Sequence, residues 1–246
     1  MSPRTLFALI VLLTAFHIPF HAQTSPTLAY GDVVAGEISD SIYENSYTFA
    51  GNTGDVIVIE MESLDRSFFN PLWAPVLILR TSEGIILADT TAAYSVDNTV
   101  LVASLAASDG YTITATREGG AMGESTGQFR LTLNLIPQIT LDSPMTGQIS
   151  SAEGSQYYRI RSEQSFSLHY IHLNGDFYPV VALNRIDSAE GRLDELAAIR
   201  GEEITEAIIG RFRLDTLYII TLSEDEFHFN GDEVLADFEI RLEVSE

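Results

Sequence analysis

The sequence predicts an all-β protein of two tandem antiparallel β-sandwich domains, jelly-roll-like in form, that follow a cleaved signal peptide. Three observations favour this fold class. Residues 127–135 alternate apolar and polar side chains without error, a related stretch at 236–244 closes the second half, and short segments of the same kind fill the chain between turn residues. A period of two is typical of a half-buried strand, because successive side chains of an extended backbone point to opposite faces.

The first 22 residues have the layout of a secretory signal peptide. Arg4 precedes an apolar run at residues 6–13, and we expect cleavage after Ala22. The alternative is an apolar N-terminal strand. The run is shorter than the about 20 residues that a membrane-spanning helix needs. No cysteine follows it and no later run is long enough to span a membrane, so we expect a released protein, secreted, extracellular or at the cell envelope.

The composition excludes several classes of partner and of stabilising bond. The chain has 13 basic and 35 acidic residues, a net charge of -22, no cysteine, and arginine as its only basic residue type apart from histidine. Such a surface repels nucleic acid and anionic lipid, so neither partner is expected. Without cysteine no disulfide is available, and stability must come from core burial or bound ions. The charge also favours solubility.

The first half reads as a series of short strands with no convincing amphipathic helix. Gly and Asn residues supply the positive φ angles that the tight connections need. We predict eight strands, near residues 33–38, 46–49, 56–62, 75–80, 85–89, 99–104, 111–116 and 127–135. Eight strands at this spacing favour a sandwich or a jelly roll.

The second half repeats the order of motifs in the first. Five motifs recur 104 to 111 residues later: Gly36-Glu37-Ile38 as Gly147-Gln148-Ile149, Tyr47-Thr48-Phe49 as Tyr158-Arg159-Ile160, Pro75 to Leu79 as Pro179 to Leu183, Tyr111 to Ala115 as Tyr218 to Leu222, and the closing strand. We therefore predict domains at residues 27–136 and 139–246, with the boundary between Pro137 and Pro144. Pro137 ends the preceding strand because it lacks a donor for the ladder.

One segment breaks the repeat. Residues 191–212 include apolar and charged residues at spacings that suit a short helix. The phase of the repeat instead predicts two strands, near 196–199 and 207–212. We favour strands, because tertiary context outweighs helix propensity over so few residues.

The framework residues of the first half resemble the bacterial pre-peptidase C-terminal domain. The motifs are Gly36-Glu37-Ile38, Tyr47 with Phe49, Gly54-Asp55-Val56, Pro75 to Leu79 with Glu83-Gly84, Gly110-Tyr111-Thr112-Ile113, and Gly127 to Leu133. They cover residues 30–136 well and residues 139–244 more weakly.

This resemblance implies a jelly-roll-like sandwich of the kind found on secreted peptidases and other exported proteins. There such domains bind substrate polymers or assist secretion, and some relatives hold calcium. Only Asp89 remains of the Asp pair that often follows the Gly turn in the family, and no peptidase domain is present. The resemblance therefore leaves calcium open and implies no activity.

No catalytic group or metal site is expected from the motifs. Residues 123–127 spell Gly-x-Ser-x-Gly, but a nucleophile elbow needs a strand before the Ser and a helix after it, whereas here a strand follows. His169 and His172 are three apart on a predicted strand and face opposite sides, and His228 lies in a hairpin approach. We expect all three to be partly exposed strand residues. The acidic turn at 224–226, 232 and 233 lacks calcium-loop spacing, so we interpret it as solvated.

Two aromatic loops are the candidate ligand-binding sites. Phe69 and Trp73 precede one apolar strand, and Phe177 and Tyr178 precede its counterpart in the second half. Exposed aromatic rings stack on sugars or bury against a partner, although such residues more often cap a sandwich core.

Together these observations predict a secreted, non-catalytic module that binds extracellular polysaccharide or protein at the cell envelope. The alternatives are a structural spacer or secretion-accessory unit, with calcium at its junction as one form, and a hydrolase whose groups sequence spacing does not reveal. No cofactor is expected. The oligomeric state does not follow from the sequence.

Overall fold

The computed structural model of the chain describes residues 25–64, 72, 74–90, 98–140, 143–150, 154–161, 166–175, 178–187, 191–200, 206–211, 217–224 and 235–244. Within these residues the secondary structure is β-strand, apart from the short 3-10 helix η1 (Gly120–Met122). The predicted all-β class is confirmed. The predicted signal peptide at residues 1–22 lies outside the described residues.

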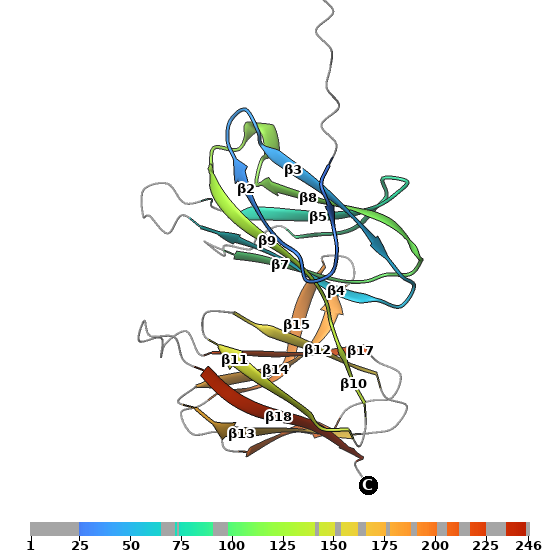
Figure 1. The fold of residues 1–246 in the computed structure, drawn as a ribbon, viewed down its shortest axis with the longest axis vertical. Helices are drawn as coiled ribbons and strands as arrows, with labels where there is room; N and C mark the ends of the chain where they lie inside the picture. The colour runs from blue at the N-terminus through green and yellow to red at the C-terminus, as the bar shows by residue number, and fades with distance from the viewer. Residues whose placement is uncertain are drawn as a thin grey trace, which may run out of the picture.

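The first half forms two sheets that face each other (Figure 1). A five-stranded sheet has the order β1-β3-β8-β5-β6, and a four-stranded sheet has the order β2-β9-β4-β7. From β2 onward consecutive strands lie in opposite sheets, except for the β5–β6 hairpin, as in a jelly roll. The strands are β1 (Thr27–Leu28), β2 (Val33–Ile38), β3 (Glu44–Gly51), β4 (Val56–Ser63), β5 (Pro75–Thr81), β6 (Ile86–Thr90), β7 (Asn98–Ser104), β8 (Asp109–Arg117) and β9 (Gly127–Leu135).

The second half has the same sheet orders, β10-β12-β17-β14-β15 and β11-β18-β13-β16. We call the two halves the first and the second sandwich. The strands of the second are β10 (Gln138–Ile139), β11 (Met145–Ser150), β12 (Gln156–Arg161), β13 (Phe166–Asn174), β14 (Pro179–Asp187), β15 (Arg192–Arg200), β16 (Glu206–Arg211), β17 (Leu217–Glu224) and β18 (Leu235–Val244).

The apolar face of each closing strand fills a core between two sheets. Phe129, Leu131 and Leu133 of β9 are fully buried in the first core, while the side chains between them lie toward solvent. In β18 the equivalent buried set begins with Phe238 and Ile240. Burial of each such side chain contributes about 1.5–3 kcal/mol. The alternation in the sequence is therefore the alternation between core and surface.

The strand register explains the repeated glycine of the two halves. Gly36 of β2 pairs with Phe129, and Gly147 of β11 pairs with Phe238. A Cβ built on Gly36 would lie 2.2 Å from Cζ of Phe129, and one on Gly147 would lie 2.6 Å from Cζ of Phe238. Each ring lies directly over a backbone that has no side chain, so only glycine fits at either position.

The structure corrects one part of the predicted fold. Both five-stranded sheets contain a parallel pair, because β1 runs parallel to β3 and β10 runs parallel to β12. The sandwiches are therefore not wholly antiparallel. The segment between 191 and 212 forms β15 and β16, which confirms strands over a helix: β15 pairs with β14 along its whole length.

The two sandwiches pack directly on each other (Figure 1). The outer face of β4 and β7 meets the outer face of β12, β14, β15 and β17. The contact contains a third apolar cluster, formed by Val56, Val58, Val102, Ile136 and Ile219, with Val100, Tyr157, Ile186, Leu193 and Leu217 packed against it. This cluster, which we call the junction, was not predicted.

Candidate functional site

Two loops meet at one end of the first sandwich around the buried side chain of Arg117. Its Nε donates to the carbonyl of Gly120 at 2.9 Å, and its Nη1 donates to the carbonyl of Ser125 at 2.8 Å and to Oδ1 of Asp40 at 3.2 Å. The guanidinium side chain is 1% exposed, whereas that of Asp40 is 88% exposed. A buried cation needs such acceptors. Arg117 therefore holds the β8–β9 loop to the β2–β3 loop.

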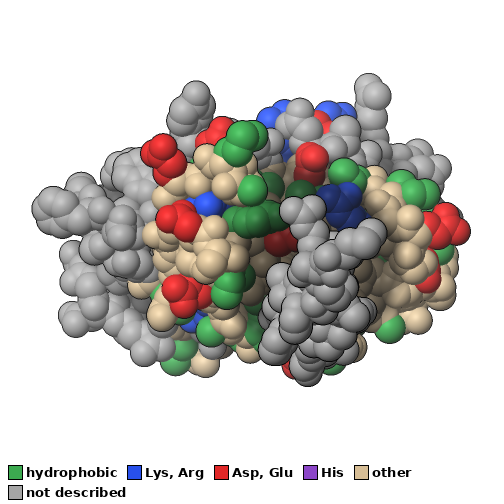
Figure 2. Space-filling model, turned by 90° about the horizontal axis from the view of Figure 1, so that it is seen from above, with side chains coloured by type: hydrophobic (Ala, Val, Ile, Leu, Met, Phe, Trp, Pro, Cys, Tyr) green, Lys and Arg blue, Asp and Glu red, His purple; other side chains and the backbone are tan. Residues whose placement is uncertain are grey.

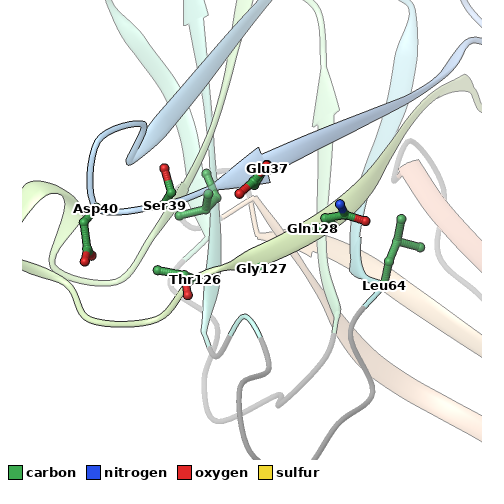
Figure 3. Close-up of a pocket in the computed structure, with 8 residues that line it drawn as sticks. Glu37, Ser39, Asp40, Leu64, Thr126, Gly127 and Gln128 are labelled. Carbon is green, nitrogen blue, oxygen red and sulfur yellow. The ribbon is translucent and has the colours of Figure 1, made fainter.

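A hollow of about 490 Å³ lies beside these loops (Figure 3). Glu37 and Gln128 face it from the neighbouring strands β2 and β9, while Asp40 and Thr126 approach it from the loops. The remaining lining is Ile38, Ser39, Leu64 and Gly127. Its size is within the range of about 300–1,000 Å³ seen for ligand sites. Because carboxylate, amide and hydroxyl oxygens dominate, the hollow suits a ligand that donates hydrogen bonds.

The surroundings of the hollow are acidic and partly apolar. In the view of Figure 2, acidic side chains lie among apolar ones over the face seen from above. Leu64 is 46% exposed and Ile42, in the β2–β3 loop, is 51% exposed. The backbone N–H of Ile42 donates to Oγ of Ser39, which fixes Ile42 beside a residue that lines the hollow. Apolar contact and hydrogen bonding are thus both available at this end.

At the equivalent place in the second sandwich, three described side chains hydrogen-bond to one another. Gln148 and Asp237 have the register positions that Glu37 and Gln128 have in the first sandwich. Nε2 of Gln148 donates to Oδ1 of Asp237 at 3.0 Å, and Nδ2 of Asn174 donates to Oδ2 of the same carboxylate at 2.6 Å. These groups satisfy one another. Within the described residues, the two sandwiches therefore differ at the same place.

The first aromatic loop begins and ends beside the hollow. Phe69 and Trp73 lie outside the described residues, but the flanks of their loop are described. The N–H of Leu64 donates to the carbonyl of Gln128 at 2.9 Å, and the N–H of Glu118 donates to the carbonyl of Ala74 at 3.1 Å. Leu72 is fully buried against Gly127.

The second aromatic loop belongs to the second sandwich. Phe177 lies outside the described residues, and Tyr178 is partly buried immediately before β14. The loop turns at Gly175, where φ is +96° and a Cβ would lie 2.3 Å from the carbonyl oxygen of Leu235. The carbonyl of Gly175 is 2.8 Å from Nε2 of His172. The two predicted aromatic pairs therefore belong to different sandwiches.

The Gly-x-Ser-x-Gly stretch lies in the connection between β8 and β9, which belong to different sheets, so it is a loop but not a hairpin loop. Residues 123–126 follow η1 and lead into β9, and the carbonyl of Ser125 accepts a hydrogen bond from Arg117. A strand rather than a helix follows, so the geometry of a nucleophile elbow is absent from this stretch.

The histidines only partly match the prediction. His169 and His172 of β13 face opposite sides, as expected, with Nε2 of His169 3.2 Å from Oε2 of Glu243. His169 is 8% exposed, so the prediction of partial exposure is wrong for this residue: packing in the middle of a sheet face buries it. His228 and most of the acidic turn, residues 225, 226, 232 and 233, lie outside the described residues. Among the described residues, no three His, Cys, Asp or Glu side chains gather as a metal site would require.

Comparison with known proteins identifies no family. No family model matches the sequence, and no curated protein matches it. Within the described residues, no helix has the length and apolar character needed to cross a membrane.

Three solved structures are similar to parts of the chain. The pre-peptidase C-terminal domain of a collagenase from Bacillus anthracis is 12% identical over 45% of this chain and 94% of its own, with a TM-score of 0.35. The CUB1-EGF-CUB2 domains of rat MASP-1 are 10% identical over 87% and 99%, with a TM-score of 0.24. The same domains of human MASP-1/3 are 12% identical over 85% and 99%, with a TM-score of 0.22. The strands themselves establish the fold class, an all-β protein built of β-sandwiches.

Proposed function

We propose that the protein is an exported, non-catalytic binding protein that recognises extracellular polysaccharide or protein at the cell envelope. The observation that carries the proposal is the end of the first sandwich, where Arg117 fixes two loops beside an open, oxygen-lined hollow. Loops held by a rigid sandwich are the usual place for recognition in folds of this kind. The secretory layout of residues 1–22 supports the location.

We also propose that the chain contains two copies of a domain like the pre-peptidase C-terminal domain, at residues 27–136 and 139–246. The same sheet order in both halves supports this division. So does the equivalent pairing of Gly36 with Phe129 and of Gly147 with Phe238. In this proposal the first copy keeps the hollow, and the second copy has closed the equivalent place with Gln148, Asn174 and Asp237.

A binding screen against immobilised polysaccharides and matrix proteins tests the proposed function. Trp73→Ala and Tyr178→Ala test the two aromatic loops, and Gln128→Ala tests the hollow. We expect Gln128→Ala and Trp73→Ala to weaken binding, because position 128 lines the hollow and the loop of Trp73 begins and ends beside it. Leu173→Ala, an exposed position in the second sandwich, is the control. Unchanged binding in all the test variants would reject this site.

The second candidate function is a structural spacer or secretion-accessory unit. The junction favours it, because direct packing of the two sandwiches fixes their relative orientation. Calcium is a separate part of this candidate. A ligand that binds the native state raises its stability, so thermal unfolding with calcium and with chelator tests the ion. Identical melting temperatures under both conditions would remove calcium from the proposal.

A further inference from the structure

A partly buried carboxylate lies at the junction. Glu60 lies on the outer face of β4, and its Oε1 accepts a hydrogen bond from the hydroxyl of Tyr157, on β12 of the second sandwich, at 2.8 Å. Burial raises the pKa of Glu60, and the charge of Glu62 adds to the rise. The hydrogen bond from Tyr157 and the charge of Arg130 act in the opposite direction without cancelling it. The ionised form of Glu60 is therefore disfavoured where it lies.

The hydroxyl of Tyr157 remains a hydrogen-bond donor to Glu60. Burial, together with the charge of Glu60 and the hydrogen bond to it, raises the pKa of Tyr157 well above its ordinary value. The hydroxyl is thus protonated wherever Glu60 titrates, and Glu60 alone changes charge.

The β14–β15 hairpin of the second sandwich extends to the junction. Its strands have nine residues each, whereas the equivalent β5 and β6 have seven and five. Near the tip of the longer hairpin, Ile186 and Leu193 pack against the junction cluster. The carbonyl of Gly191 accepts a hydrogen bond at 2.7 Å from the N–H of Val102, which lies on the edge strand β7.

The two outer faces of equivalent sheets also differ in character. Tyr157 and Ile219 have the register positions that Ser46 and Thr112 have in the first sandwich. At these two positions the outer face carries large side chains in the sandwich where it meets a partner, and small hydroxyl side chains in the other. This difference indicates that the docking is a built feature of the chain.

From these contacts we propose that the junction is a latch, closed while Glu60 is protonated and loosened when Glu60 ionises. Separation of the sandwiches returns the carboxylate to water, where its charge costs little. The direction of the pH dependence follows from the linkage between proton binding and docking. A carboxyl group whose pKa is raised by docking favours the docked state fully below its ordinary pKa, and that contribution is lost as the pH rises through the raised value.

The other charged groups near Glu60 have partners of their own. Arg130, on β9, pairs with Glu62, and β7 carries no titratable residue. Nη1 of Arg159, on β12, donates to the carbonyl of Gly54 at 2.6 Å. On the hairpin, Arg185 and Arg192 both pair with Asp194. Among the described residues, no cation forms an ion pair with Glu60, and the charge of Arg130 acts on it without cancelling the effect of burial.

Distance measurement by electron paramagnetic resonance tests the latch in the full chain. The sequence has no cysteine, so labels at Glu83→Cys and Arg161→Cys, both exposed and on different sandwiches, are specific. We expect one narrow distance distribution below the ordinary pKa of Glu and loss of the narrow peak as the pH rises through the raised pKa of Glu60. Glu60→Gln keeps an acceptor for Tyr157 but cannot ionise, and it is expected to hold the narrow peak at every pH.

Two further variants complete the test. Glu44→Gln, an exposed carboxylate of β3, is the matched control and should behave as the unsubstituted chain does. Tyr157→Phe should shift the loss of the narrow peak to lower pH, because ionised Glu60 loses its donor. Circular dichroism verifies that each variant is folded. A distribution that does not change with pH, or an unchanged pH dependence in Glu60→Gln, overturns the proposal.

Discussion

The ring of Phe129 lies over Gly36 so closely that a Cβ at position 36 would be 2.2 Å from Cζ of the ring. We expect Gly36→Ala to destabilise the protein by about 1–3 kcal/mol, because an added carbon in a packed core forces the ring to move. Denaturant unfolding measures the change. Gly110→Ala is the control: no atom lies within 4 Å of its Cβ, so its cost should be small. Equal losses in both variants would contradict the close packing of Phe129.

Arg117 gives a second prediction. Arg117→Ala removes one donor from the carbonyl of Gly120 and one from that of Ser125, and we expect a loss of about 1–3 kcal/mol in unfolding free energy. Hydrogen exchange should rise in residues 118–126. Asp40→Asn is the comparison, because an exposed partner contributes about 0–1 kcal/mol. If the two variants proved equally stable, Arg117 would not be the anchor of the loops.

Gly191 gives a third prediction, on the junction. Its φ is +62°, and a Cβ would lie 2.8 Å from Cβ of Ala88 and 3.1 Å from Cγ of Leu101. Gly154 has a similar φ of +77° but no atom within 4 Å of its Cβ. Both alanine variants carry the left-handed backbone cost of about 1–2 kcal/mol. Only Gly191→Ala should also loosen the sandwiches, which small-angle X-ray scattering would detect as a larger radius of gyration. A radius unchanged from that of Gly154→Ala would show that the hairpin does not hold the junction.

Acid stability gives a fourth prediction. Burial opposes ionisation of Asp55, but hydrogen bonds from the N–H of Asn52 and the hydroxyl of Tyr30 outweigh it and lower the Asp55 pKa. A lowered pKa contributes stability above the ordinary Asp value, and that contribution disappears as the pH falls through the lowered one. Tyr30→Phe should therefore raise the Asp55 pKa and move acid unfolding to higher pH.

Nuclear magnetic resonance titration of the Asp55 carboxyl checks this shift. Tyr43→Phe, at an exposed tyrosine of the β2–β3 loop, serves as the control and should leave the titration in place. An Asp55 pKa that stays low without the hydroxyl of Tyr30 would assign the effect to Asn52 and the charge of Arg159.

The strand pattern was predictable where one face is buried and the other exposed. The alternation in β9 and β18 identified both closing strands, and the phase of the repeat placed β15 and β16 correctly. The two-residue strands β1 and β10 were missed, because two residues do not reveal a period.

The junction was missed although the sequence carries a signal for it. Val56, Ile57, Val58 and Ile59 are four consecutive buried residues at the start of β4. A continuous apolar run indicates a strand covered on both faces. Read in that way, β4 would have predicted a partner on the outside of the first sandwich.

The sequence analysis did not single out the residues that form the hollow. The predicted aromatic residues Phe69 and Trp73 lie outside the described residues and stay a prediction, and Arg117 did not stand out. Its place after the buried residues of β8 is that of an ordinary strand end, and its burial depends on the carbonyls of a later loop. A contact between segments that no sequence period connects is not visible in the sequence alone.

The hydrogen bond from the N–H of Val102, on β7, to the carbonyl of Gly191 has a consequence for fragments of the protein. An edge strand with free N–H groups is a template on which another chain can pair. In the intact chain the N–H of Val102 already donates to the second sandwich, so it is not free to pair with another chain. Proteolysis between the two sandwiches would expose the edge strand β7, so the amino-terminal fragment should aggregate under conditions in which the intact chain does not.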